Sequence, residues 1–585
     1  MCGIAGIIRP DGLAPSDHAG AARLGALLHH RGPDSAGTFT SPTCTLIQTR
    51  LTLIGDAILP QPYRSRDGRY VIVYNGEVYN FEELSRQLQN ETQLDTGTDT
   101  EVVLASWIRW GPNALQRLNG MFAFFIWDIM EQRGFAAVDP LGIKPFFFSG
   151  ACDRFVFASE AGALIESGLV PFRPDGEAIA EFLAAPYFSG ATRLAFANIE
   201  RLLPGHSIEL TRDRIKVSEY FRFRHTRGAI RDVEALVEET AGRVEDAVVA
   251  SLRADVPVGV FLSGGVDSSL LAAIAQRHAS APVPVWTIEY EGQESVDYSR
   301  SLIVKSADRP YAERVASTHG CELHVVHVDD TAYEQALLHT LRNNDLISAW
   351  EQEVSQYLLA EAASKHVKAV LVGDAADETH FGYSFLLNPD RIASPSRIID
   401  FFGAVPTLHN DFSSRYQRHA ESLGYSWETE PEQRLAMSCL ILNLWLPRLL
   451  HNGDIHLMAH SLEGRVPFGD TRLLALAQCV PQELGYRDGI EKWHLRRAAE
   501  RLLQPEIAWR PKSALTKNVR AAKIIYRQFC RGWKKFGEGI APYIDMGFVG
   551  DLSNAGTPRN EVETGLCFRL LALMTWFGRL SGESL

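Results

Sequence analysis

A short loop at residues 263–269 contains the residue types that hold a phosphate group. Its sequence is Ser-Gly-Gly-Val-Asp-Ser-Ser; it follows an apolar, β-branched run at residues 256–262 and precedes a helical segment at residues 270–279. The apolar run predicts a buried strand of a parallel sheet. A strand, a glycine turn and a helix N-terminus together direct backbone N–H groups toward an anion. Gly264 and Gly265 let the backbone approach a phosphate closely.

The charged and hydroxyl groups of this loop indicate which kind of phosphate-binding loop it is. No Lys follows the glycines, so the loop is not a Walker A motif. Asp267 places a carboxylate where a phosphate is expected, which is favourable if Mg²⁺ bridges the two anions. Ser268 and Ser269 can cap the following helix and donate hydroxyl groups. The alternative is a glycine turn capped by Ser and Asp, without a ligand.

A second candidate site follows another predicted buried strand, at residues 368–372. Three carboxylates come within five residues there: Asp374, Asp377 and Glu378. The carboxyl end of a parallel strand is where α/β sheets bind ligands. Carboxylates this close repel each other unless a cation is present. The alternative is a solvated acidic turn.

Cys2 is a candidate nucleophile of another kind. If Met1 is removed, Cys2 carries both a thiol and a free α-amine, and the amine can act as general base for its own thiol. A small buried residue near a strand start is the simpler interpretation of Cys2 alone. It is followed, however, by a series of further polar and glycine-containing motifs at residues 29–34, Arg50, residues 75–77 and residues 97–101.

Each of these later motifs also has a simpler alternative. Asn75-Gly76 could form a hairpin turn, Arg50 could form a surface ion pair of little energetic value, and Asp99 could cap a helix. Their occurrence together and in order favours one shared site.

Two domains are expected to position these groups, because the chain has 585 residues. In the N-terminal half, strand-like runs alternate with helical segments such as residues 21–30, which is typical of a layered α/β domain of about 200 residues. We predict a first domain at 1–210, a polar linker with a connecting strand at 211–233, and a second domain at 234–585.

Composition excludes several classes of protein. The formal net charge of −13 argues against a general nucleic-acid binder. No apolar run reaches the length of a membrane span, and the first residues lack the features of a signal peptide. The eight Cys are scattered, without a CxxC pair or zinc-type spacing, which predicts reduced thiols and a cytoplasmic protein.

The whole set of motifs resembles the glutamine-hydrolysing asparagine synthetase family. The N-terminal half contains CGIAGI, HHRGPD, YNGEVYN and GTDTE, and the C-terminal half contains SGGVDSS, GDAADE, EGRVPF and RPK. This resemblance implies an α/β fold with two parts. A class II glutamine amidotransferase domain, an Ntn-hydrolase αββα sandwich, would precede a parallel-sheet domain of the PP-loop type, which cleaves ATP between its α and β phosphates.

The resemblance also implies roles in glutamine hydrolysis. Cys2 would attack the glutamine carboxamide, and Asn75 with the N–H of Gly76 would form the oxyanion hole. Arg50 would pair with the α-carboxylate of glutamine. Residues implied to bind glutamine are Arg50, Asn75, Glu77 and Asp99.

In the second domain, Asp267 and Asp377 would be magnesium ligands by the same resemblance. Asp374 would lie near the acceptor as a candidate base. Lys512, in Arg510-Pro511-Lys512, would stabilise charge on pyrophosphate and in the amidation transition state. Residues implied to bind ATP are Leu262, Ser263, Gly264, Gly265, Asp267, Ser268, Ile288 and Gly373.

The implied reaction uses ATP and Mg²⁺. It converts a carboxylate, aspartate in the family, into an acyl-adenylate, which ammonia from glutamine then turns into an amide. The sequence departs from the family pattern at Ala375, at residues 379–381, at Ile455 and at residues 513–518. Another carboxylic acid therefore stays open as the acceptor. A non-catalytic scaffold is a further alternative, against which the retained Cys2 argues, and the resemblance allows a homodimer.

Overall fold

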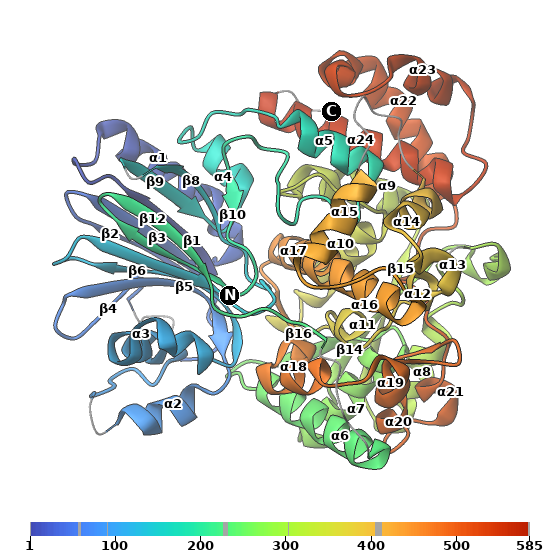
Figure 1. Ribbon diagram of the computed structural model, residues 1–585, viewed down its shortest axis with the longest axis horizontal. Helices are drawn as coiled ribbons and strands as arrows, with labels where there is room; N and C mark the ends of the chain where they lie inside the picture. The colour runs from blue at the N-terminus through green and yellow to red at the C-terminus, as the bar shows by residue number, and fades with distance from the viewer. Residues whose placement is uncertain are drawn as a thin grey trace.

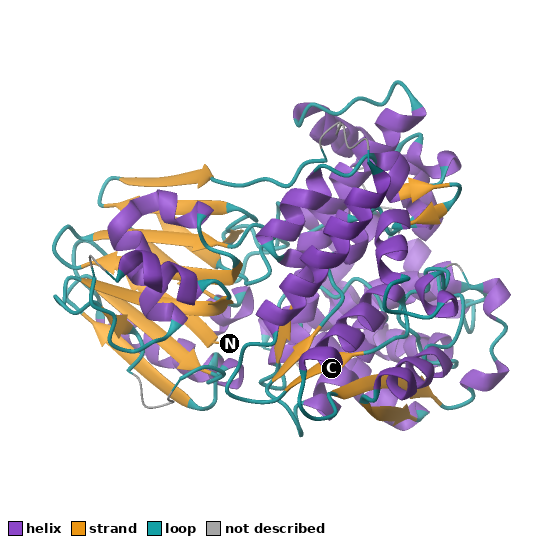
Figure 2. Cartoon of the chain, turned by 90° about the horizontal axis from the view of Figure 1, so that it is seen from below, coloured by secondary structure: helices purple, strands orange, loops and turns teal. Residues whose placement is uncertain are grey.

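The computed structural model describes residues 2–55, 60–89, 92–151, 153–225, 232–301, 303–403 and 412–582. Two domains lie side by side, one rich in sheet and one rich in helix (Figures 1 and 2). Residues 226–231 of the predicted linker, and Cys152, lie outside the described residues. No described helix is long and apolar enough to cross a bilayer.

The N-terminal domain consists of two stacked, six-stranded antiparallel sheets. One has the order β10-β8-β9-β1-β3-β2 and the other β12-β11-β7-β6-β5-β4. Alternate side chains of both sheets form the apolar layer between them, including Ile4, Val73, Phe125 and Phe157. The strands are β1 Cys2–Ile8, β2 Ser35–Thr40, β3 Cys44–Arg50, β4 Tyr63–Arg64, β5 Tyr70–Val78, β6 Gly120–Asp128, β7 Arg133–Val138, β8 Phe147–Ala151, β9 Arg154–Ala158, β10 Glu200–Arg201, β11 His206–Thr211 and β12 Arg214–Glu219.

Helices cover both outer faces of these sheets. Helices α1 (Pro15–Leu27) and α4 (Ala161–Glu166) pack on the sheet that contains β1, and α3 (Asp99–Trp110) packs on β5 with α2 (Phe81–Leu88) beside it. The domain is therefore the αββα sandwich that the sequence predicts. Strand β12 falls within the segment predicted as linker, and it pairs with β11 at the edge of the second sheet.

The C-terminal domain contains a five-stranded parallel sheet, also as predicted. Its order is β15-β14-β13-β16-β17, from strands β13 Val258–Phe261, β14 Pro284–Tyr290, β15 Glu322–Val328, β16 Ala369–Leu371 and β17 Glu463–Arg465. The chain reverses direction across the sheet after β15. Helices α7 (Val266–His278) and α8 (Arg309–His319) pack together against the sheet, and so do α10 (Gln352–Ala363) and α17 (Leu446–Met458).

Helices around and beyond this sheet complete the domain. Those that the site uses are α6 Val233–Ser251, α7 Val266–His278, α8 Arg309–His319, α9 Asp330–Asn343, α10 Gln352–Ala363, α11 Ala376–Thr379, α17 Leu446–Met458, α20 Trp493–Ala499, α22 Ala521–Ile540 and α24 Glu561–Ser581. Near the C-terminus, α24 packs against α22 and also contacts α9 and α4. It thus joins both domains.

Candidate active sites

Cys2 begins strand β1 and is buried beside Asn75 of strand β5. The backbone N–H of Cys2 donates to Asn75 Oδ1 over 3.1 Å. The amide nitrogen Nδ2 of Asn75 is buried and has no hydrogen-bond partner among the described residues. Such an unpaired donor is costly unless a ligand oxygen accepts from it. The interior position of Asn75 in β5 shows that the hairpin-turn alternative is wrong.

Gly76 and the Cys2 thiol complete this corner of the site. A Cβ atom at Gly76 would lie 2.2 Å from the carbonyl oxygen of Met121, so the paired strand leaves room only for glycine. Burial raises the pKa of the Cys2 thiol, while the nearby Arg50 guanidinium acts in the opposite direction. The thiol is therefore protonated at neutral pH and needs a base to become nucleophilic.

The strand register places Arg50 beside Cys2, and Glu77 lies on β5, the strand that also carries Asn75. Arg50 is paired with Cys2 between β3 and β1 and is largely buried. Its Nη2 donates to the carbonyl oxygen of Ile54 over 3.2 Å. Glu77 lies 3.5 Å from Arg465 of the C-terminal domain, a partner that sequence reasoning missed.

Asp99 lies at the start of α3 and is held by its own domain. Its Oδ2 accepts from the Tyr74 hydroxyl over 2.7 Å and from the Val78 N–H over 3.1 Å. Burial raises the pKa of both Glu77 and Asp99. Two buried carboxylates with raised pKa values favour a cationic group between them, such as an α-ammonium group.

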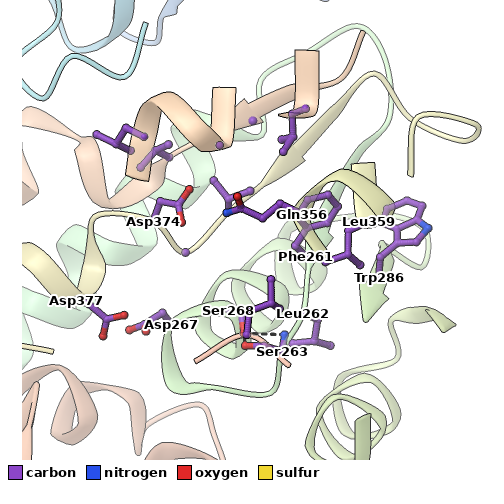
Figure 3. Close-up of a pocket in the computed structure, with 18 of the residues that line it drawn as sticks. Phe261, Leu262, Ser263, Asp267, Ser268, Trp286, Gln356, Leu359, Asp374 and Asp377 are labelled. Atoms are coloured by element: carbon purple, nitrogen blue, oxygen red, sulfur yellow. Dashed lines mark hydrogen bonds between the residues drawn. The ribbon is translucent and has the colours of Figure 1, made fainter. Parts of the chain in front are cut away.

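The loop at residues 263–269 wraps around a hydroxyl pair. The N–H of Ser263 donates to Ser268 Oγ over 3.2 Å, and the two serine hydroxyls are 3.0 Å apart (Figure 3). Gly264 has a φ of +72°, and a Cβ there would lie 2.3 Å from Cβ of Tyr311. The prediction that Ser268 and Ser269 cap the helix is wrong. Gly265 is the N-cap, and both serines lie within the first turn, where Ser268 instead closes the loop.

The acidic segment after β16, residues 374–378, faces the loop at residues 263–269, called the phosphate loop below, as its position on the sheet predicts. Asp267 and Asp377 point toward each other (Figure 3). Lys492 Nζ lies between them, 2.5 Å from Asp267 Oδ2 and 2.6 Å from Asp377 Oδ1. Lys512 also forms an ion pair with Asp377.

Sequence reasoning missed Lys492 because no motif or pattern in the surrounding sequence distinguishes it from a surface lysine. It follows the hairpin of β18 (Tyr486–Arg487) and β19 (Ile490–Glu491) and precedes α20. Its backbone φ is +51°, an uncommon value for a residue with a side chain, and it is 1% exposed. Only the fold brings its ammonium group to residues more than 100 positions away.

The two carboxylates have the features of a magnesium site. Asp267 Oδ2 and Asp377 Oδ1 meet at Lys492 Nζ, whereas Asp267 Oδ1 is buried with no hydrogen-bond partner among the described residues. Mg²⁺ commonly takes one or two carboxylates and completes its shell with phosphate oxygens and water. The described residues contain no group of three His, Cys, Asp or Glu side chains that could hold a metal alone. The site therefore fits Mg²⁺ that is bound together with a phosphate.

The carboxylates of this loop have pKa values that are shifted in opposite directions. Burial disfavours ionisation of Asp377, but Lys492 and Lys512 outweigh it and lower the pKa of Asp377 to about 2. Burial raises the pKa of Asp374 to about 6, against the effect of Lys512. A carboxyl group with a pKa near 6 can accept a proton at neutral pH and release it again.

One cavity of about 220 Å³ connects these groups with the domain interface. Leu262, Ile288 and Gly373, which are predicted to bind ATP, line it; Gly264 and Gly265 are not among its lining residues. Ile143 and Lys144 of the N-terminal domain also line it. Further lining residues are Phe261, Ser263, Asp267, Ser268, Trp286, Thr287, Asp308, Gln356, Leu359, Val372, Asp374, Asp377, Leu450, Gly453, Asp454, Leu457, Gly464, Val466, Lys512, Ser513 and Leu515.

Buried ion pairs join this cavity wall to the Cys2 region. Arg31 donates to Asp454 Oδ2 over 2.6 Å, to Glu160 over 3.0 Å and to the carbonyl oxygen of Cys2 over 3.3 Å. Lys144 Nζ lies 3.4 Å from Asp454 Oδ1. The His-Arg-Gly-Pro-Asp motif thus connects the two domains at this point.

The two sites define a glutamine amidotransferase in which a glutaminase domain and an ATP-dependent synthetase domain share one chain. Residues 1–221 match the family described as glutamine amidotransferase domain, and residues 239–576 match the family described as asparagine synthase. The chain belongs to the asparagine synthase family.

Curated relatives match most of the chain. Asparagine synthetase (glutamine-hydrolyzing) 3 of Bacillus subtilis is 29% identical over 540 residues, with 88% of this chain and 87% of that protein covered. A putative asparagine synthetase (glutamine-hydrolyzing) of Mycobacterium bovis is 31% identical, with the same coverage. Amidase chyE of Penicillium rubens is 26% identical, with 87% of each chain covered.

Proposed function

We propose that the chain transfers the amide nitrogen of glutamine to a carboxylic acid through an acyl-adenylate. The observation that carries the proposal is the single cavity lined by the phosphate loop, by Asp374 and Lys512, and by Ile143 and Lys144 of the glutaminase domain. A cavity that reaches the N-terminal domain at Ile143 and Lys144 suits internal transfer of ammonia, since ammonia released to neutral water becomes ammonium, which is not nucleophilic.

In the glutaminase site, the Cys2 thiolate would attack the glutamine carboxamide carbon. The α-amine of Cys2 would take up the thiol proton and return it to the leaving ammonia. The unpaired Nδ2 of Asn75 and the N–H of Gly76 would donate to the oxyanion. Arg50 would pair with the α-carboxylate, and Glu77 and Asp99 would hold the amide and α-amino groups. Water then releases glutamate from the thioester.

In the synthetase site, the acceptor carboxylate would attack the α-phosphorus of ATP and release pyrophosphate. Leu262, Ile288 and Gly373 would contact the adenine, while the residues of the phosphate loop would hold the phosphates. Lys492 and Lys512 would offset the charge of the leaving pyrophosphate. Mg²⁺ held by Asp267 and Asp377 would supply further charge neutralisation when bound.

Amide formation would follow at the same place. Ammonia attacks the carbonyl carbon of the adenylate, AMP leaves with the bonding electron pair, and a proton must leave the nitrogen. Asp374 is suited to accept that proton, because burial raises its pKa to about 6 and it faces the cavity.

Aspartate is the primary acceptor in this proposal, on the strength of the family. A second acceptor class is favoured by the cavity itself. Its described lining contains no arginine, and its two lysines already pair with Asp454 and Asp377. This lining thus offers no unpaired cationic side chain for a second carboxylate of the acceptor. A less charged acid fits these walls, which include many apolar residues.

Mass spectrometry would test the proposal, with ATP, Mg²⁺, glutamine labelled with ¹⁵N in its amide and either aspartate or a panel of monocarboxylic acids. Labelled asparagine with one AMP per amide is the expected result for the primary acceptor. Glutamate without AMP in the presence of aspartate would contradict that acceptor. Absence of AMP with every acid would overturn the synthetase assignment.

A further inference from the structure

A small cavity, of about 20 Å³, lies between the N-terminal domain and two helices of the C-terminal domain. Its lining comes from α5 (Gly176–Ala184) and the connection after it, from the loop before α10, and from α17 and α24 (Figure 1). It shares no lining residue with the cavity of the synthetase site. A cavity needs about 10–15 Å³ to hold one water, so this space takes a single particle of that size.

Arg448 of α17 is the charged residue of this lining, which contains no acidic side chain. Its side chain is 2% exposed, and its Nη2 donates to the backbone carbonyl oxygen of Ile347. In the part of the chain that the structure describes, Nε of Arg448 is buried without a hydrogen-bond partner, and no carboxylate forms an ion pair with this guanidinium. Burial lowers the pKa of Arg448 to about 10, so the group stays charged at neutral pH. A buried charge without a counter-ion is costly.

The charged groups around Arg448 do not supply that counter-ion. Glu353 acts on Arg448 electrostatically, but its two oxygens accept from other groups, including His456 over 3.1 Å. Arg201 is a second buried arginine, and among the described residues it donates only to backbone carbonyl oxygens. Burial and the charge of Arg448 lower the pKa of Arg201 to about 10, while the carboxylates that act on Arg201 accept from other groups. An anion beside Arg448 would therefore be stabilised.

Trp576 of α24 adds a second unpaired donor to the same cavity. Its ring is 2% exposed, and its indole N–H has no hydrogen-bond partner among the described residues. Indole and guanidinium groups donate and cannot accept, so neither can satisfy the other. The hydroxyl group of Ser189, which also lines the cavity, already donates to the carbonyl oxygen of Pro186 over 3.0 Å. An occupant of this space thus meets two unpaired N–H donors and one positive charge.

We propose that this cavity binds a single halide ion, such as chloride. The ion accepts from the guanidinium of Arg448 and from the indole N–H of Trp576, and it neutralises the buried charge. The space is too small for a phosphate or a carboxylic acid, and a water molecule would pair the donors without offsetting the charge. Because the lining comes from both domains, the ion joins the N-terminal domain to α17. The proposal concerns binding and does not depend on the acceptor or on turnover.

Bromide would locate the site directly, because it resembles chloride and gives an anomalous X-ray signal. Two charge-assisted hydrogen bonds predict a Kd on the order of 10 mM. Crystals of the full-length protein soaked in about 0.5 M sodium bromide, well above this Kd, should show an anomalous peak in the cavity. The peak should lie within hydrogen-bonding distance of both Arg448 and Trp576 Nε1. A cavity that holds only water, or nothing, under these conditions would overturn the proposal.

Thermal unfolding in sodium chloride and in sodium gluconate at equal ionic strength would test the site in solution, since gluconate is too large to enter. Chloride at ten times its Kd should raise the ratio of folded to unfolded protein about elevenfold. Trp576→Phe removes one donor and should weaken chloride binding about tenfold, and Arg448→Met should abolish the difference between the two salts. If Arg448→Met does not fold, Trp576→Phe decides.

Trp127→Phe is the matched control for Trp576→Phe. Trp127 of β6 is also 2% exposed with an unpaired indole N–H among the described residues, but it does not line this cavity. Its substitution should leave the chloride effect unchanged. An undiminished chloride effect in Trp576→Phe, or an equal loss in Trp127→Phe, would contradict the assignment.

Discussion

The glutaminase and synthetase sites are built in different ways. The residues around Cys2 come from adjacent strands of two sheets, where backbone register fixes Cys2 beside Arg50. Asp267 and Asp377 lie in the first turns of α7 and α11, Lys492 and Lys512 lie in loops, and the four meet only through their side chains. Loops carry function on a rigid scaffold, whereas strands position groups with little freedom.

The two sites also differ in charge. Glu77 and Asp99 are buried carboxylates whose pKa values are raised, chiefly by burial. Asp377 has a lowered pKa because two lysines contact it. The first site thus favours an incoming cationic group, and the second supplies its own cations to an anionic substrate.

Removal of the nucleophile should separate the two sites most completely. In Cys2→Ala, we expect glutamine-dependent amide formation to fall at least about 10³-fold, because no other thiol can form the thioester. Amide formation from ammonium salts should remain. Product analysis with each nitrogen source would measure both. Loss of both activities would contradict the two-site description.

Removal of the bridging lysine should affect only the synthetase site. In Lys492→Met, we expect AMP formation to fall at least about 10²-fold, because Asp267 and Asp377 lose the ammonium group between them. Glutamine hydrolysis should continue. Lys492→Arg should recover part of the loss, and Lys523→Met serves as control for an exposed lysine. Normal AMP formation in Lys492→Met would contradict this role.

A pH profile should reveal Asp374. Its raised pKa, about 6, means that the carboxyl is ionised at pH 7 and protonated below pH 6. Only the ionised form accepts a proton, so amide formation at constant free ammonia should fall about tenfold per pH unit below pH 6. Asp374→Asn should be slow and lack this inflection. An unchanged profile in Asp374→Asn would show that another group titrates.

The smallest effect concerns backbone strain in the synthetase loop. Ala375 has a φ of +70°, whereas its neighbour Ala376 begins helix α11. In Ala375→Gly, relief of about 1 kcal/mol of strain offsets the lost methyl burial, so unfolding free energy should change by less than about 1 kcal/mol. Ala376→Gly relieves no strain and should lower the free energy of unfolding by about 1–2 kcal/mol more than Ala375→Gly does. Urea denaturation measures both, and equal losses would contradict the difference in strain.

Local patterns predicted much of the fold. The apolar runs at residues 256–262 and 368–372 contain β13 and β16. Alternating and continuous apolar patterns identify strands, because strands with one or both faces buried need apolar side chains at those positions. The helix cap at Ser268 was predicted wrongly. Gly265 occupies the N-cap, since glycine is also accepted there, and the Ser268 hydroxyl instead accepts from the backbone N–H of Ser263 within the loop.

The sequence by itself determined the order of the domains, the strand-loop-helix that forms the phosphate loop, and the positions of Cys2, Asp267 and Asp377. These features depend on residue type and on short spacing along the chain, so they can be predicted from the local sequence. Tertiary structure alone decided that Lys492 lies between Asp267 and Asp377, that Arg465 reaches Glu77, and that Arg448 and Trp576 line one cavity. Each of these contacts joins residues from distant parts of the chain. The local sequence pattern does not show which buried side chains will come into contact when the chain packs.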